Sequence, residues 1–216
     1  MLHSEANATA LPWLEVPPPD RESGEAAPQT LWLNGSAIIK NGRMVGRIDD
    51  QTTRGLLWVL DEIGMAEITF APSAGKGKIS VQILRSRTRL IPEIKNGKWT
   101  MTIKVDTHDD IVENQSNLVL GDPRIVDVLE KDIERQIELR IRQALEWLQK
   151  ELKTDAFGFA DAYHRKYPAE WQRAKDRWEA IFPEIEVNIL ANAKVKRYGL
   201  ATDPQGTPEE EVKTRQ

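Results

Sequence analysis

With 216 residues, 40% of them hydrophobic, the sequence is long enough to bury the core of one large domain, or of one domain and a smaller piece. Its net charge of −4 argues against a nucleic-acid-binding protein, because such domains are usually clearly basic. The absence of cysteine excludes disulfides, thiol catalysis and thiolate metal sites.

The N-terminal region shows neither a membrane span nor a signal peptide. No apolar run reaches the roughly twenty residues that cross a bilayer, and no basic region precedes an apolar core. Residues 1–30 place five prolines among Glu, Ser, Gly and Asp, a composition that buries too little apolar surface to offset its ordering entropy. We predict that residues 1–30 are a disordered linker from a missing upstream region. The alternative is that Trp13, Leu14 and Val16 dock on the folded part.

Two Asn-Gly dipeptides, at residues 41–42 and 96–97, each lie between apolar runs. This pattern is the strongest short signal for a β-hairpin. It predicts one hairpin over residues 31–48, which is either part of the main domain or a remnant of a preceding module. It also predicts that strands over residues 78–94 and 98–106 pair with each other.

A helix is predicted over residues 50–64. Asp50 or Thr52 is suited to cap its first turn, and Gly64 is suited to end it. Residues 66–71 then alternate in the manner of a short strand.

The strand over residues 78–94 changes character along its length. Strict alternation puts one set of apolar and basic residues on a single face: Ile79, Val81, Ile83, Arg85, Arg87 and Arg89. One interpretation is that the strand leaves the core and its arginines extend over neighbouring residues. The other is a basic stripe that meets an acidic partner or anionic lipid headgroups.

Residues 106–110 hold three carboxylates and a histidine. Because the spacing of an EF-hand is missing, a calcium site is not indicated. We predict a solvated loop here, followed by a weaker strand over residues 111–120.

The longest predicted element is a helix that starts at Asp122-Pro123, a pair suited to a helix cap and first turn. Apolar residues then recur every three or four positions, with charged and amide side chains between them, which is typical of an amphipathic helix. The stripe is Ile125, Leu129, Ile133, Ile137, Ile141, Leu145, Leu148 and Leu152. A rod of this length must lie across a broad sheet or a partner helix.

Two short helices are predicted after the long one, over residues 157–166 and from Pro168 to before Pro183. Residues 184–198 alternate between apolar and polar, as in a strand with one buried face. The expected fold class is therefore α+β: an antiparallel sheet, the long helix packed across one face, and the shorter helices at one end. The tail from residue 201 to residue 216 is predicted to be disordered.

One stretch of the sequence points to a particular protein family, which the periodic patterns alone do not. Residues 155–187 read DAFGFADAYHRKYPAEWQRAKDRWEAIFPEIEV, and they closely resemble the C-terminal domain of the C subunits of bacterial spore germinant receptors, the Ger(x)C family. The blocks Gly35–Lys40, Thr53–Trp58 and Lys78–Val81 agree with the same family in the expected order. The resemblance covers about residues 31–200, which we expect to form one domain.

The resemblance implies a function. Members of this family are exported lipoproteins with a signal peptide, a lipid-bearing cysteine and a further N-terminal domain, so we expect this sequence to be a C-terminal fragment or a truncated product. They are anchored on the outer face of the spore inner membrane and work with integral-membrane A and B subunits. The implied role is a non-enzymatic subunit that acts through protein contacts, with no nucleic acid, cofactor or metal.

Candidate site residues come mainly from the aromatic segment. The partner-binding hypothesis names Phe157, Phe159, Tyr163, His164, Arg165, Tyr167 and Trp171, with Arg54 as a weaker addition. The alternative is that these aromatics cap the core. Two other functions stay open: a small-ligand or lipid-binding domain with a pocket between the long helix and the sheet, and a hydrolase that uses His164 with Asp161, one helical turn away.

Overall fold

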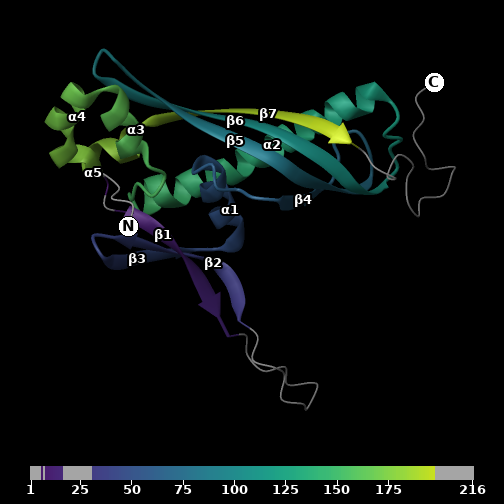
Figure 1. Ribbon diagram of the computed structural model, residues 1–216, viewed down its shortest axis with the longest axis horizontal. Coiled ribbons are helices and arrows are strands. Elements are labelled where there is room, and N and C mark those ends of the chain that lie inside the picture. The colour runs from purple at the N-terminus through teal and green to yellow at the C-terminus, as the bar shows by residue number, and fades with distance from the viewer. Residues whose placement is uncertain (1–5, 7, 17–30, 198–216) are drawn as a thin grey trace.

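The computed structural model describes residues 6, 8–16 and 31–197, and it confirms the α+β fold class (Figure 1). Two sheets are present, with strand orders β1-β2-β3 and β4-β5-β6-β7. The strands are β1 Ala8–Glu15, β2 Trp32–Lys40, β3 Arg43–Ile48, β4 Ala66–Phe70, β5 Gly77–Lys95, β6 Lys98–Ser116 and β7 Glu186–Arg197. The α-helices are α1 Asp50–Val59, α2 Pro123–Leu145, α3 Phe159–Lys166, α4 Pro168–Ala174 and α5 Trp178–Ile181.

The β5–β6 hairpin is the frame of the larger sheet. Each strand has 19 residues, so the hairpin is roughly 60 Å long at about 3.3 Å per residue. Its turn is the predicted Asn96-Gly97 pair, with φ of 52° and 76°. The predicted loop over residues 106–110 is wrong: β6 runs through it without interruption. These residues form the ladder to β5 instead, with Asp106 opposite Arg87.

Strand β7 lies beside β6 but runs parallel to it, so the sheet is mixed rather than purely antiparallel. A parallel neighbour requires a long crossover connection, and the segment from α2 to α5 supplies it. The predicted alternation is confirmed. Ile185, Ile189 and Ala193 are buried, Val187 and Ala191 are partly buried against the core, and the residues at the alternate positions are exposed.

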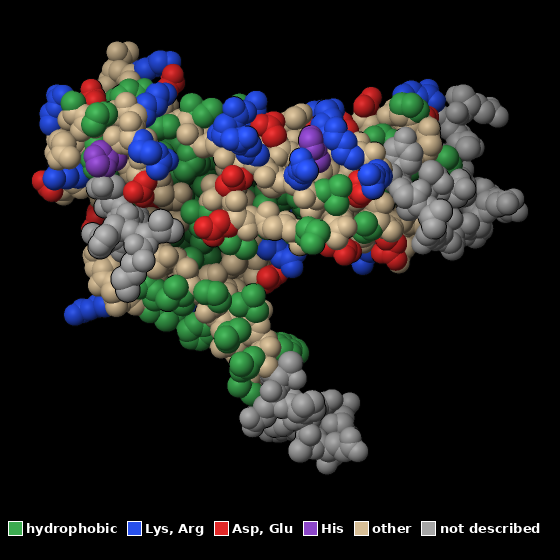
Figure 2. Space-filling model, viewed as in Figure 1, with side chains coloured by type: hydrophobic (Ala, Val, Ile, Leu, Met, Phe, Trp, Pro, Cys, Tyr) green, Lys and Arg blue, Asp and Glu red, His purple; other side chains and the backbone are tan. Residues whose placement is uncertain are grey.

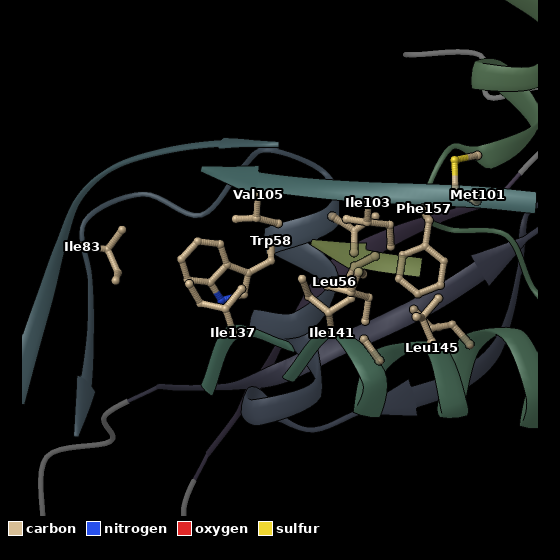
Figure 3. Close-up of a cluster of buried hydrophobic side chains, with 14 of the residues drawn as sticks. Leu56, Trp58, Ile83, Met101, Ile103, Val105, Ile137, Ile141, Leu145 and Phe157 are labelled. Atoms are coloured by element: carbon tan, nitrogen blue, oxygen red, sulfur yellow. The ribbon is translucent and has the colours of Figure 1, made fainter. Parts of the chain in front are cut away.

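Helix α2 covers the inner face of this sheet, as predicted. The Asp122 side chain accepts a hydrogen bond from the backbone N–H of Arg124 at 2.9 Å, and Pro123 occupies the first turn. The core of the apolar stripe is fully buried: Leu129, Ile133, Ile137, Ile141 and Leu148 are 0% exposed. Figure 3 shows part of this contact, with side chains of α2 facing those of β6. The helix continues as a π-helix over Glu146–Glu151.

A register shift between Ile83 and Arg85 changes the face of strand β5. Leu84 is the extra residue of this bulge, and a bulge of one residue reverses the side to which the following side chains point. The three arginines Arg85, Arg87 and Arg89 are therefore exposed on the face opposite α2, and the prediction that they share the face of Ile83 is wrong.

The smaller sheet corrects the prediction for the N-terminal region. Residues 8–15 form strand β1, which pairs with β2 from Ala8 opposite Lys40 to Glu15 opposite Trp32. Pro12 is compatible with this strand because β1 is at the edge of its sheet. The predictions of disorder for residues 17–30 and 201–216 lie outside the described residues.

Helix α1 joins the smaller sheet to α2. Its cap is Asp49 rather than Asp50 or Thr52: the Asp49 carboxylate accepts from the Thr52 N–H at 2.8 Å. The contact with α2 depends on Gly55, because a Cβ atom there would overlap the carbonyl oxygen of Arg140 and would lie 2.9 Å from Cβ of Ala144.

We expect Gly55→Ala to lower the free energy of unfolding by about 2–3 kcal/mol or more, since one of the two helices must shift to admit the methyl group. Chemical denaturation followed by tryptophan fluorescence measures this change. Gly64→Ala is the matched control, because a Cβ at Gly64 meets no atom within 4 Å. Equal stability of the two variants would show that the α1–α2 contact is not close.

Asp109 is a carboxylate inside the core. It is 0% exposed on the inner face of β6, and one oxygen accepts from Thr107 Oγ1 at 2.7 Å. Among the described residues the other oxygen has no hydrogen-bond partner. Burial raises the pKa of Asp109 to about 7, and the neighbouring carboxylates of Glu130 on α2 and Asp110 act in the same direction.

Asp109 should therefore make the protein less stable as pH rises. The pKa of Asp109 is about 7 in the folded chain, and its ordinary value, which applies to the unfolded chain, is 3.8. Between pH 3.8 and pH 7 the folded chain therefore holds a proton that the unfolded chain has lost. We expect Asp109→Asn to remove this slope and to raise the free energy of unfolding at pH 8 by on the order of 2 kcal/mol. Denaturation at pH 4.5 and pH 8 measures it, with the exposed Asp127→Asn as control.

Candidate partner-binding surface

The segment between α2 and α3 is organised by one buried carboxylate, Asp155. One oxygen accepts from the N–H groups of Phe157 at 3.2 Å and Phe159 at 3.1 Å. The other accepts from the Ala160 N–H at 2.8 Å and from Trp178 Nε1 at 3.2 Å. Burial raises the pKa of Asp155 to about 6, although these four hydrogen bonds favour the charged form. Asp155 thus joins the start of α3 to α5.

Gly158 completes this turn, because its φ of +77° is a left-handed conformation that other residues rarely adopt. It directly precedes α3, and its conformation lets the side chains of its two neighbours, Phe157 and Phe159, lie side by side. The rings of Phe157 and Phe159 are stacked, with centroids 5.4 Å apart.

The aromatic side chains of the predicted site form the core at this end of the molecule. Phe157, Phe159, Tyr163 and Trp171 are 0–1% exposed. Tyr163 packs on Trp99 of β6 at 4.6 Å, and its hydroxyl donates to the carbonyl of Thr100. Figure 1 shows the short helices gathered at the turn end of the β5–β6 hairpin. The alternative interpretation, core capping, therefore describes these four side chains.

The other predicted site residues are more accessible but are not all together. Arg165 is exposed, while His164 and Tyr167 are half-buried, and the His164 ring stacks on Trp171 at 6.1 Å. Arg54 lies on α1, apart from α3 and α4 in Figure 1. It pairs there with Asp50 at 3.0 Å and also donates to the carbonyl of Glu67.

A second surface, which the sequence analysis missed, lies on the smaller sheet. We define the apolar sheet surface by six residues that are 50–62% exposed: Leu11, Leu14, Val16, Leu31, Trp32 and Leu33. Figure 2 shows hydrophobic side chains gathered on this projecting sheet. The sequence feature that could have predicted this surface is the uninterrupted apolar run Leu31-Trp32-Leu33. Successive strand residues face opposite sides, so a run of exposed apolar residues leaves both sides of β2 uncovered.

A cluster of metal-binding side chains and a membrane-spanning helix are both absent from the part of the chain that the structure describes. No group of three or more His, Asp or Glu side chains is placed to hold a metal ion there. No helix among the described residues is both long enough and apolar enough to span a membrane.

The predicted pocket between α2 and the sheet is not found along the middle of the helix, where the apolar stripe is packed. A groove of about 500 Å³ lies at the end of this contact. Its lining comes from residues 142–150 on one side and 184–187 on the other.

We expect Asp155→Asn to lower the free energy of unfolding by about 3 kcal/mol, because an amide presents N–H groups to donors that need an acceptor. The near-ultraviolet circular dichroism of the tryptophans should weaken as Trp178 loses its hydrogen bond. Thermal unfolding and these spectra are the measurements. The exposed Asp176→Asn is the control, and unchanged stability of Asp155→Asn would contradict the role given to this carboxylate.

The chain is similar in sequence and in fold to known proteins of one family. Residues 34–199 match the sequence model of the family described as "Spore germination B3/ GerAC like, C-terminal". Spore germination protein B3 of Bacillus subtilis (strain 168) is 30% identical over 170 residues, covering 77% of this chain and 45% of that protein. Spore germination protein KC of the same organism is 28% identical over 176 residues, covering 81% of this chain and 43% of that protein.

A solved structure, the crystal structure of the GerBC protein, has the same fold. It superposes with a TM-score of 0.74 at 25% identity, over 87% of this chain and 56% of that one. The chain thus spans less than half of the two Bacillus subtilis proteins and just over half of the solved structure. Because the family match covers most of the sequence, the chain belongs to the GerAC-like C-terminal family of spore germination proteins, the germinant receptor C-subunit family.

Proposed function

We propose that this chain is a non-enzymatic subunit of a nutrient germinant receptor and acts through protein–protein contacts at the outer face of the spore inner membrane. Its partners in this proposal are the integral-membrane A and B subunits, and the contacts are made by the domain of residues 31–200 together with the N-terminal segment that pairs with it as β1. The observation that carries the proposal is the apolar sheet surface. Membership of a spore germination family supports the cellular setting.

The apolar sheet surface has the character of a protein interface. Large apolar side chains that gather on a protein surface mark an interaction site. All six residues are at least half exposed, and Leu14 lies directly opposite Leu33 on the paired strands β1 and β2. Trp32 lies between Leu31 and Leu33 in sequence but faces the other side of β2, and it is 59% exposed. Tryptophan is one of the residue types enriched at positions where alanine substitution strongly weakens a complex.

The sheet that carries this surface is held firmly to the rest of the chain. Thr53 Oγ1 on α1 donates to Ser36 Oγ on β2 at 3.2 Å. Lys40 pairs with Glu179 at 2.7 Å, and Leu152 packs against Gly46 so closely that a Cβ there would lie 2.8 Å from it. A partner bound to the small sheet would therefore be connected through these contacts to α1, α5 and the residue that follows the π-helix.

The surface around α3 and α4 is proposed as a second contact, reduced to the side chains that remain accessible. Arg165 is exposed, and His164 and Tyr167 are half-buried. The buried aromatics beneath them serve to fix the position of these three residues. The carrying observation remains the apolar sheet surface, because its side chains are exposed rather than packed among the described residues.

We expect Leu33→Asp to abolish most of the co-purification of this chain with the A and B subunits from spore membranes, since a charge would be buried in the contact. A loss of at least tenfold in recovered partner is expected. Leu139→Asp is the matched control, because Leu139 on α2 is 47% exposed and lies outside the surface. Thermal unfolding of both variants shows whether the fold is kept. Equal recovery with both variants would refute this surface as the contact.

A further inference from the structure

The face of the larger sheet opposite α2 carries a concentration of positive charge. The bulge at Leu84 puts Arg85, Arg87 and Arg89 on this face, and Lys104 lies opposite Arg89 on β6. Figure 2 shows Lys and Arg side chains gathered along the body of the molecule. The whole chain has a net charge of −4, so this positive surface is a local feature that overall composition conceals.

Two of these arginines are free to bind an anion. Asp106, the cross-strand partner of Arg87, accepts from Arg89 at 3.2 Å and lies 4.0 Å from Lys104. Its charge is therefore balanced by those two cations. Within the described part of the chain, no ion pair is formed by Arg85 or Arg87, and both are exposed.

Beside the two arginines lies a groove of about 620 Å³. Its charged and aromatic polar lining is Arg85, Arg87, His108 and Asp106, the last already paired with Arg89. Its apolar lining comes from the turn before β4 and from the bulge: Ile63, Met65 and Leu84. Met65 is 81% exposed and Leu84 is 39% exposed. Guanidinium groups beside projecting apolar side chains suit a ligand that is anionic at one end and apolar at the other.

We propose that this groove and the basic sheet face around it bind the phosphate headgroups of anionic phospholipids at a membrane surface. Arg85 and Arg87 contact the phosphate, and Met65 and Leu84 enter the boundary between headgroups and acyl chains. A membrane is favoured over an acidic protein for two reasons. The cations spread over neighbouring strands of one sheet face, and Leu190 and Ile91, 55% and 40% exposed, place further apolar side chains on that face.

The test is sedimentation of the purified 216-residue chain with vesicles. One set contains about one third phosphatidylglycerol in phosphatidylcholine, and the other contains phosphatidylcholine alone. Each basic residue near an anionic surface contributes about 1 kcal/mol. Arg85→Gln combined with Arg87→Gln should therefore weaken partition into the anionic vesicles by roughly 30-fold at low salt. Met65→Ser should weaken it several-fold without changing the salt dependence.

The control has the same change in charge at the far end of the molecule: Arg173→Gln combined with Lys175→Gln, both exposed. It should bind as the parent does. Glycerol phosphate in solution serves as a separate arm, and we expect it to compete weakly because it lacks the apolar part. Equal binding to both vesicle types, equal loss in the control, or capture by an oligoglutamate peptide without vesicle binding would each overturn the proposal. None of these results depends on the receptor subunits, so the proposed function is tested separately.

Discussion

The contact between the apolar stripe of α2 and the inner face of β5, β6 and β7 is the interaction on which the rest of the structure depends. Burial of large aliphatic side chains such as Ile133 and Ile137, each 0% exposed, contributes about 1.5–3 kcal/mol apiece. The contact also fixes positions beyond the sheet. Helix α1 crosses α2 at Gly55 and holds the smaller sheet, so the apolar sheet surface owes its place to the same helix.

Polar side chains in this core specify the arrangement more than they stabilise it. Asp155 satisfies three backbone N–H groups and one indole, but burial makes its charged form costly. Gln149 Nε2 in the π-helix donates to the carbonyls of Phe182 and Ile185 at 2.9 and 2.8 Å. The two groups join α2, α3, α5 and the start of β7, and a slip of any of these elements would leave buried donors unpaired.

The elements that follow from local periodicity could be predicted, and those that follow from tertiary pairing could not. The Asn-Gly turns, the Asp122 cap and the stripe of α2 are set by nearest neighbours along the chain. By contrast, residues 106–110 were predicted as a loop because they are acidic, but they form a strand. Their pairing with β5 supplies backbone hydrogen bonds that the local sequence does not reveal. The face of Arg85 depends on a one-residue bulge, which alternation alone does not reveal.

The same limit applies to the candidate site. The aromatic segment stood out in the sequence because it is rich in large rings, yet composition alone does not separate a ring that packs inward from one that meets a partner. The geometry makes the separation at Tyr163 and Trp171, which are buried. On the smaller sheet the reverse holds, since Trp32 was part of a predicted hairpin and only the structure shows that nothing among the described residues covers it.

Helix α2 also covers the free edge of β7 with two carboxylates. An edge strand is prone to pair with another chain. Here the backbone N–H of Val195 donates to Glu130 at 3.0 Å, and that of Ala193 donates to Glu134 at 3.3 Å. Lys194 pairs with Glu130 at 2.6 Å and balances its charge. These carboxylates occupy two of the donors that an added strand would need at the β7 edge, so pairing of another chain with this edge is disfavoured.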